Sequence, residues 1–136
     1  MKLNNEYLKS LLISIEEIPS PRPNLKFILE AMGLDDINDE FLLHYEVIAD
    51  YGLIEGAITP EKIGLVDSFD GTSWVNIDIR LTATGHEFVS NIRQSEVWET
   101  IKEKFKEDSI DTVFSVAKKL AENIAKKKLD HYLNNI

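Results

Sequence analysis

The sequence predicts an α+β fold in which helices lie at both ends of the chain and a small antiparallel sheet lies between them. Three observations lead to this prediction. Residues 4–18 and residues 110–133 carry apolar side chains at helical spacing, and residues 75–81 alternate apolar and polar side chains at period two. A chain of 136 residues with 43% apolar residues can bury a core. We therefore expect one domain over residues 1–136.

The first elements follow from local signals. Residues 4–18 place Tyr7, Leu8, Leu11, Leu12 and Ile15 on one face of a first helix. Three prolines within residues 19–23 then require a loop, because proline lacks a backbone donor. Residues 25–29 predict a short edge strand. Asn38 is placed to cap a helix that runs to about Tyr51, and Gly52 is placed to end it.

The centre of the chain predicts strands. Residues 53–55 form a candidate strand directly after Gly52, and residues 75–81 give the clearest strand pattern. The dipeptide Asp70-Gly71 lies between that strand and the apolar stretch 63–69. Because this dipeptide favours the positive backbone dihedrals of a tight turn, we expect a two-stranded ribbon there.

The last third of the chain predicts helices. Thr84 and Glu87 have the spacing of a capping box that opens the next helix. Residues 94–95 are expected to kink or recap this helix, which then continues to near Asp108. The final helix is expected over residues 110–133.

This order of elements is that of a winged helix-turn-helix domain, with a small antiparallel sheet or β-ribbon wing and a C-terminal helical extension. We expect a winged-helix core over residues 1–84 and helices over residues 85–136 that pack on it.

Three stretches of the sequence resemble a known family: His44 to Glu55, Arg80 to Phe88, and Val97 to Lys104. In this order they are similar to an uncharacterised family of bacterial and prophage proteins, the domain of unknown function "twenty-five thirteen". The resemblance covers nearly the whole chain. It implies a winged-helix fold and a phage or mobile-element setting, and it implies no established activity and no catalytic residues.

The charge of the chain disfavours recognition of nucleic acid. The chain has 15 lysines and arginines against 24 aspartates and glutamates, for a formal net charge of -9. No lysine or arginine occurs between Ile28 and Pro60. Eight acidic residues occur in that segment: Glu30, Asp35, Asp36, Asp39, Glu40, Glu46, Asp50 and Glu55. Because DNA binding normally gains from phosphate neutralisation, we expect that helix 39–51 does not read a DNA groove.

The outward side of helix 39–51 instead predicts a protein-binding surface. Leu43, Val47 and Tyr51 are spaced by four residues and form an apolar ridge flanked by carboxylates. The predicted site comprises Glu40, Leu43, Glu46, Val47, Asp50 and Tyr51. The alternative is that the C-terminal helices cover this ridge as part of the core. The leading hypothesis is a regulatory protein-binding module with a host or phage protein as partner, and a host DNA-binding factor is a candidate.

The positive charges lie late in the chain. Five lysines on the last helix are candidate phosphate contacts: Lys118, Lys119, Lys126, Lys127 and Lys128. They form a solvated helix face in one interpretation, and in the other they make the chain a DNA-binding transcriptional regulator. The same helix has enough apolar periodicity to pack on its own domain or to pair two protomers as a homodimer.

The sequence disfavours several classes of function. The chain has no cysteine, and its histidines, His44, His86 and His131, lie far apart in the sequence. His44 is a candidate acid or base, but no nucleophile motif or phosphate-binding glycine loop accompanies it. We therefore expect no catalytic residue, no metal site and no cofactor. No apolar run approaches the roughly 18 residues of a membrane span, so we expect a cytoplasmic protein without a membrane partner.

Overall fold

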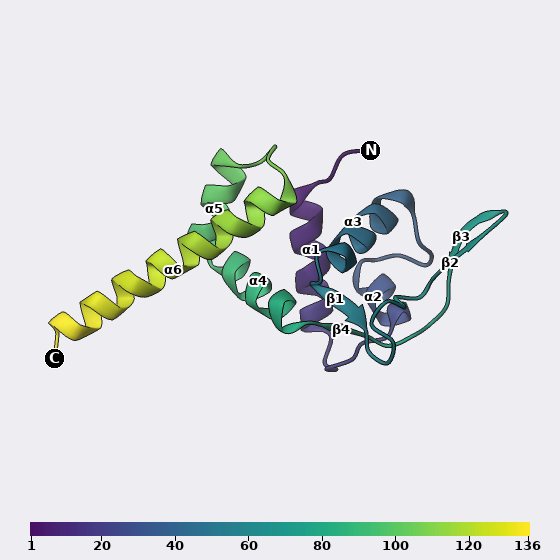
Figure 1. The fold of residues 1–136 in the computed structure, drawn as a ribbon, viewed down its shortest axis with the longest axis horizontal. Helices are drawn as coiled ribbons and strands as arrows, with labels where there is room; N and C mark the ends of the chain where they lie inside the picture. The colour runs from purple at the N-terminus through teal and green to yellow at the C-terminus, as the bar shows by residue number, and fades with distance from the viewer. The chain divides into compact units, whose positions relative to one another are not determined.

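The computed structural model describes residues 1–136 and shows an α+β chain with six helices and two small antiparallel sheets (Figure 1). Contacts within the chain divide it into two compact units, residues 1–86 and residues 87–136. The sheets and the first three helices belong to the first unit.

Helix α1 (Asn5–Glu17) confirms the first prediction. The side chain of Asn4 caps it by accepting hydrogen bonds from the backbone N–H groups of Glu6 and Tyr7, at 2.9 and 3.2 Å. Its apolar face is buried and comprises Leu8, Leu11, Leu12 and Ile15. The helix therefore contributes its periodic face to the core of the first unit.

The edge strand predicted over residues 25–29 is wrong, because this segment forms helix α2 (Leu25–Ala31). The Asn24 side chain accepts a hydrogen bond from the N–H of Phe27 at 2.9 Å and caps the helix. Leu25, Ile28 and Leu29 are buried, which is the i, i+3, i+4 pattern of a helix. In so short a segment this pattern cannot be distinguished from that of a buried strand by sequence alone.

Helix α3 (Asp39–Asp50) confirms the predicted cap and terminator. The Asn38 side chain accepts a hydrogen bond from the N–H of Phe41 at 2.8 Å. At the other end Gly52 has a φ of 67°, a left-handed conformation that glycine adopts without strain. Strand β1 (Ile54–Gly56) follows directly, as expected.

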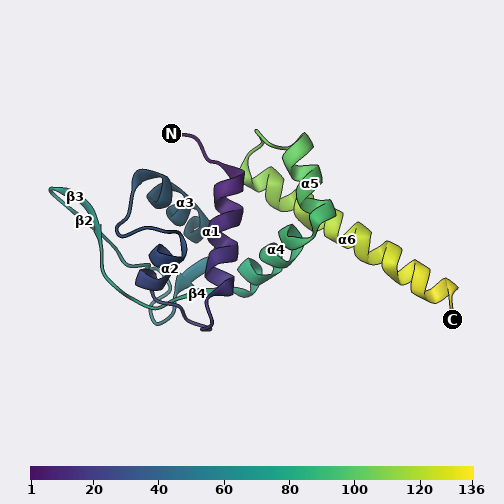
Figure 2. The same cartoon turned by 180° about the vertical axis from the view of Figure 1, so that it is seen from behind.

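A hairpin is present, but its strands differ from those predicted. Strand β2 (Leu65–Ser68) pairs with β3 (Gly71–Trp74), and Phe69 and Asp70 connect them. No non-glycine residue has a positive φ, so only Gly71, at 115°, supplies the positive dihedral expected of the Asp70-Gly71 pair. Figure 2 shows this hairpin extending away from the helices of its own unit.

The single strand predicted over residues 75–81 is also wrong in extent. Only β4 (Ile79–Leu81) is a strand, and it pairs antiparallel with β1, not with the hairpin. The preceding residues 75–78 run past the start of α2, where the N–H of Leu25 donates to the carbonyl oxygen of Ile77 at 2.9 Å and Asn24 bridges Asp78. The alternation therefore continues through a segment that makes only isolated backbone contacts.

Helix α4 (Ala83–Arg93) begins at a different cap from the one predicted. The Thr82 hydroxyl accepts a hydrogen bond from the N–H of Gly85 at 3.0 Å, so Thr82 is the capping residue and the expected capping box of Thr84 and Glu87 does not form the cap. Gly85 is required at this turn because a Cβ there would overlap the carbonyl oxygen of Leu53.

The remaining helices are α5 (Ser95–Lys104) and α6 (Ile110–Asn134). The break at residues 94–95 is as expected, although α5 ends at Lys104 and not near Asp108. Phe88 of α4 stacks on Phe114 of α6, with ring centroids 5.0 Å apart. The long α6 confirms the predicted last helix (Figure 1). No helix of the chain has both the length and the apolar character that crossing a membrane requires.

Candidate protein-binding site

Helix α3 presents a buried face and an acidic face. Phe41, Tyr45 and Ile48 have no exposed surface and hold the helix in the first unit. On the other side of the helix, Glu40, Glu46 and Asp50 are exposed. The acidic part of the predicted site is therefore open to solvent.

The apolar part of the predicted site is only partly open. Leu43 and Val47 are half-buried, and Tyr51, just past the end of α3, is 42% exposed. The three side chains do not form a fully exposed ridge. The exposed carboxylates are therefore more suitable points for mutagenesis than Leu43 and Val47, whose replacement would also disturb packing.

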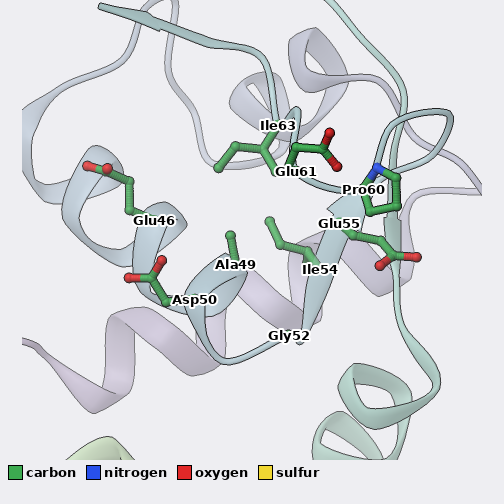
Figure 3. Close-up of a pocket in the computed structure, with 9 residues that line it drawn as sticks. All are labelled: Glu46, Ala49, Asp50, Gly52, Ile54, Glu55, Pro60, Glu61 and Ile63. Atoms are coloured by element: carbon green, nitrogen blue, oxygen red, sulfur yellow. The ribbon is translucent and has the colours of Figure 1, made fainter.

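A cavity of about 460 Å³ lies beside the C-terminal half of α3. It is bounded by α3, by β1 and by the segment that follows β1, and Figure 3 shows the residues that line it. Ala49, Ile54 and Ile63 point toward one another at its centre. The carboxylates of Glu46 and Asp50 lie on the α3 side of the cavity, and those of Glu55 and Glu61 lie on the opposite side.

The wall opposite α3 is built by a tightly folded loop. The N–H of Gly56 donates to the carbonyl oxygen of Pro60 at 3.0 Å, and the N–H of Lys62 donates to that of Thr59 at 2.9 Å. A Cβ on Gly56 would overlap the carbonyl oxygens of Thr59 and Lys62, so the loop can approach β1 this closely only because residue 56 is glycine. The loop is thereby held against β1 by backbone contacts.

Tyr45 ties this loop to α3. Its hydroxyl donates a hydrogen bond of 2.7 Å to the carbonyl oxygen of Ile63. Burial raises the pKa of Tyr45 far above its usual value, so the phenol stays neutral and remains a donor. Tyr45 therefore both fills the core and holds one wall of the cavity.

The four carboxylates of the cavity are not equivalent. Glu55 is paired with Arg80, whose Nη2 and Nε lie 2.6 and 2.9 Å from Glu55 Oε1. Glu46, Asp50 and Glu61 have no hydrogen bond or ion pair from their side chains. Glu55 and Glu61 were not among the predicted site residues, because nothing in the sequence places the loop after β1 beside α3.

His44 is buried and fully hydrogen-bonded. Its Nδ1 lies 2.6 Å from the carbonyl oxygen of Glu40, and its Nε2 accepts a hydrogen bond from the N–H of Asn4 at 2.9 Å. Because Nε2 is the acceptor, Nδ1 is the donor to Glu40. The ring also packs on Tyr7, with centroids 4.5 Å apart. These contacts make His44 a structural link between α1 and α3.

Tyr7 itself lies near the acidic face. Burial raises the pKa of Tyr7, and the carboxylate of Glu40 raises it further.

His86 is exposed, and its Nδ1 lies 3.9 Å from Glu16 Oε2. No group of three or more histidine, cysteine, aspartate or glutamate side chains is arranged to hold a metal ion.

The five lysines named as candidate phosphate contacts lie on α6, in the second unit, and all are exposed. From Lys126 to the end of the chain every residue is exposed.

Comparison with known proteins places the chain in a family. Residues 2–111 match the family described as "Hypothetical protein (DUF2513)", and the chain belongs to it. This confirms the resemblance noted in the sequence. The family description gives no activity.

One relative is a protein of Haemophilus influenzae strain Rd whose printed name is "Uncharacterized protein". It is 26% identical to this chain over 130 residues, which is 95% of this chain and 99% of the relative. No solved structure matches the chain.

Proposed function

We propose that this chain is a non-enzymatic regulatory module of phage or prophage type, built on a winged-helix architecture, that acts by binding a basic protein partner. The observation that carries the proposal is the exposed acidic face of α3, formed by Glu40, Glu46 and Asp50, in a segment without a lysine or arginine. A positively charged protein surface is the complementary partner, and long-range attraction would speed its encounter with this face.

The order of elements supports the winged-helix part of the proposal. Helix α1 is followed by the bridge at Asn24, then by α2, α3 and β1, and then by a hairpin and β4, which returns to pair with β1. In winged-helix proteins of this order the third helix is the one that contacts DNA. Here that helix carries carboxylates, which favours a partner that itself binds DNA, such as a host DNA-binding factor.

The test compares a charge-reversed chain with a matched control. The protein is used as bait against host extract, in wild-type form, as Glu46→Lys with Asp50→Lys, and as Lys127→Glu. We expect one defined basic protein to be retained by the wild type and by the Lys127→Glu control and to be lost with the double variant. Retention of that protein by the double variant would contradict the proposal.

The second candidate function is a DNA-binding transcriptional regulator, which the exposed lysines of α6 favour. Anisotropy with mixed genomic DNA at low salt distinguishes the two. Binding that weakens steeply with salt and disappears when Lys126, Lys127 and Lys128 become glutamate would support the regulator. Absence of DNA binding, together with the protein capture described above, would support the first proposal.

A further inference from the structure

The cavity beside α3 suggests which part of a basic partner is recognised. Resting on the proposed function, we infer that this cavity receives an arginine side chain from an exposed segment of the partner protein. The inference depends on three features: the apolar centre of the cavity, the carboxylates on its two sides and the fixed loop that forms its wall.

The apolar centre suits the aliphatic stem of a long side chain. Ala49 and Ile63 are half-buried and lie next to the buried Ile54 there (Figure 3), and the exposed ring of Pro60 lines the wall opposite α3. A volume of about 460 Å³ lies within the range of small-ligand sites. Arginine buries its methylene groups against such a surface while its charged end stays at the edge.

The carboxylates select a cation for that charged end. Glu46 and Asp50 are one helical turn apart, so they lie on the same side of α3, and neither has a partner within the chain. Glu61 lies on the opposite side and is also unpaired. Figure 3 shows the carboxylates of Glu46 and Glu61 at opposite rims, directed away from the apolar centre. A cationic head group that reaches either rim therefore gains electrostatic attraction that a neutral or acidic side chain of the same length does not gain.

Arginine fits better than lysine because its planar guanidinium offers several donors at fixed angles. The chain already contains such an interaction at the same wall. Arg80 directs two of its nitrogens to one oxygen of Glu55, at 2.6 and 2.9 Å. Glu55 is thereby occupied, and the incoming arginine is directed to Glu46, Asp50 or Glu61.

The wall opposite α3 is held in place by contacts within the chain. The loop of residues 57–62 is held by its own hydrogen bonds and by the close approach to Gly56, and Tyr45 fixes Ile63. A site that is already formed loses little conformational entropy on binding, so even a short segment with one arginine should bind measurably.

The test uses the full chain labelled with ¹⁵N and three acetylated, amidated pentapeptides that carry arginine, lysine or citrulline between alanines. Citrulline keeps the shape of arginine and removes its charge. We expect the arginine peptide to shift the amide signals of Ala49, Gly52, Ile54 and Ile63. Its affinity should exceed that of the citrulline peptide by about tenfold, the effect of one charge-assisted hydrogen bond, and that of the lysine peptide by a smaller factor.

Isosteric variants test the carboxylates without changing the shape of the cavity. Glu46→Gln with Asp50→Asn should lower the affinity for the arginine peptide about tenfold, and Asp70→Asn, at the remote tip of the hairpin, should leave it unchanged. All three residues are exposed, so the variants should fold as the wild type does. Equal affinity for arginine, lysine and citrulline, or signal shifts confined to other parts of the chain, would overturn the inference.

Failure of the arginine-binding inference can be distinguished from failure of the proposed function. If the peptides do not bind but the double charge reversal still abolishes capture of the host protein, the partner binds the acidic face without an arginine in the cavity. If the double charge reversal has no effect on capture, the proposed function itself fails.

Discussion

Ile79 and Val75 provide the sharpest test of this fold. The alternating pattern of residues 75–81 assigns both side chains to the buried face of one strand. In the structure Ile79 has no exposed surface and lies in β4 opposite Gly56, whereas Val75 is 49% exposed and lies outside any strand. Replacing each by aspartate should therefore have very different consequences.

The expected cost of Ile79→Asp comes from two effects. Losing the buried isoleucine side chain costs about 2–5 kcal/mol, as for other large-to-small core substitutions. A buried aspartate must also be protonated at pH 7, about three units above its ordinary pKa, which costs about 4 kcal/mol more. The total is comparable to the whole stability of a typical domain, about 5–15 kcal/mol, so the first unit should be largely unfolded. Val75→Asp keeps its carboxylate in water and should cost about 1 kcal/mol or less.

Denaturant unfolding followed by circular dichroism and by tryptophan fluorescence measures both effects. The milder pair Ile79→Ala and Val75→Ala gives free energies of unfolding when the aspartate variant does not fold. We expect about 2–5 kcal/mol for Ile79→Ala and less than about 1 kcal/mol for Val75→Ala. Equal losses at the two positions would refute the assignment of residues 75–78 to a connecting segment. A stable, cooperative Ile79→Asp variant would refute the pairing of β4 with β1.

Three further predictions follow from the same structure. Gly56→Ala should lower the free energy of unfolding by about 1–3 kcal/mol in a melting experiment and should weaken arginine-peptide binding. The reason is that the added methyl group must displace the loop that forms the cavity wall. Unchanged stability and binding would show that the loop moves without cost. Tyr45 has a higher pKa in the folded state than in the unfolded chain, so its neutral phenol favours folding fully below about pH 10 and progressively less as the pH rises above that value. Melting temperatures of the wild type and of Tyr45→Phe should accordingly converge above pH 10, and a constant difference would contradict the burial of this phenol. Asn38→Ala should cost about 0.5–2 kcal/mol in denaturant unfolding because α3 loses the hydrogen bond to the N–H of Phe41, and replacement of Asn38 by serine should largely restore it.

The candidate site was only partly predictable. Glu46 and Asp50 were predictable as exposed site residues because the apolar spacing of helix 39–51 shows which side of the helix faces outward, and both are exposed in the structure. Glu55, Glu61 and the contribution of Tyr45 to the cavity were not found. Their positions depend on how the chain folds after β1, where Gly56 allows an approach between backbone segments that no local pattern encodes.

Several elements were predictable because their signals are local. Asn38 marks a helix start, Gly52 marks a helix end, and the apolar periodicity of α1, α3 and α6 is carried by residues three and four positions apart. These interactions form within one or two turns of the chain, so their residues are neighbours in sequence as well as in space.

Which segments pair, and which periodic patterns form strands or helices, depends on contacts between distant parts of the chain. Residues 25–29 are helical and residues 75–78 lie outside the sheet, although their apolar spacing allowed other assignments. β1 finds β4 across the intervening hairpin, and the acidic cavity arises where α3, β1 and the following loop meet. Strand pairing and core packing are contacts between residues far apart in the chain. Where two local conformations are nearly equal in free energy, these contacts select one of them.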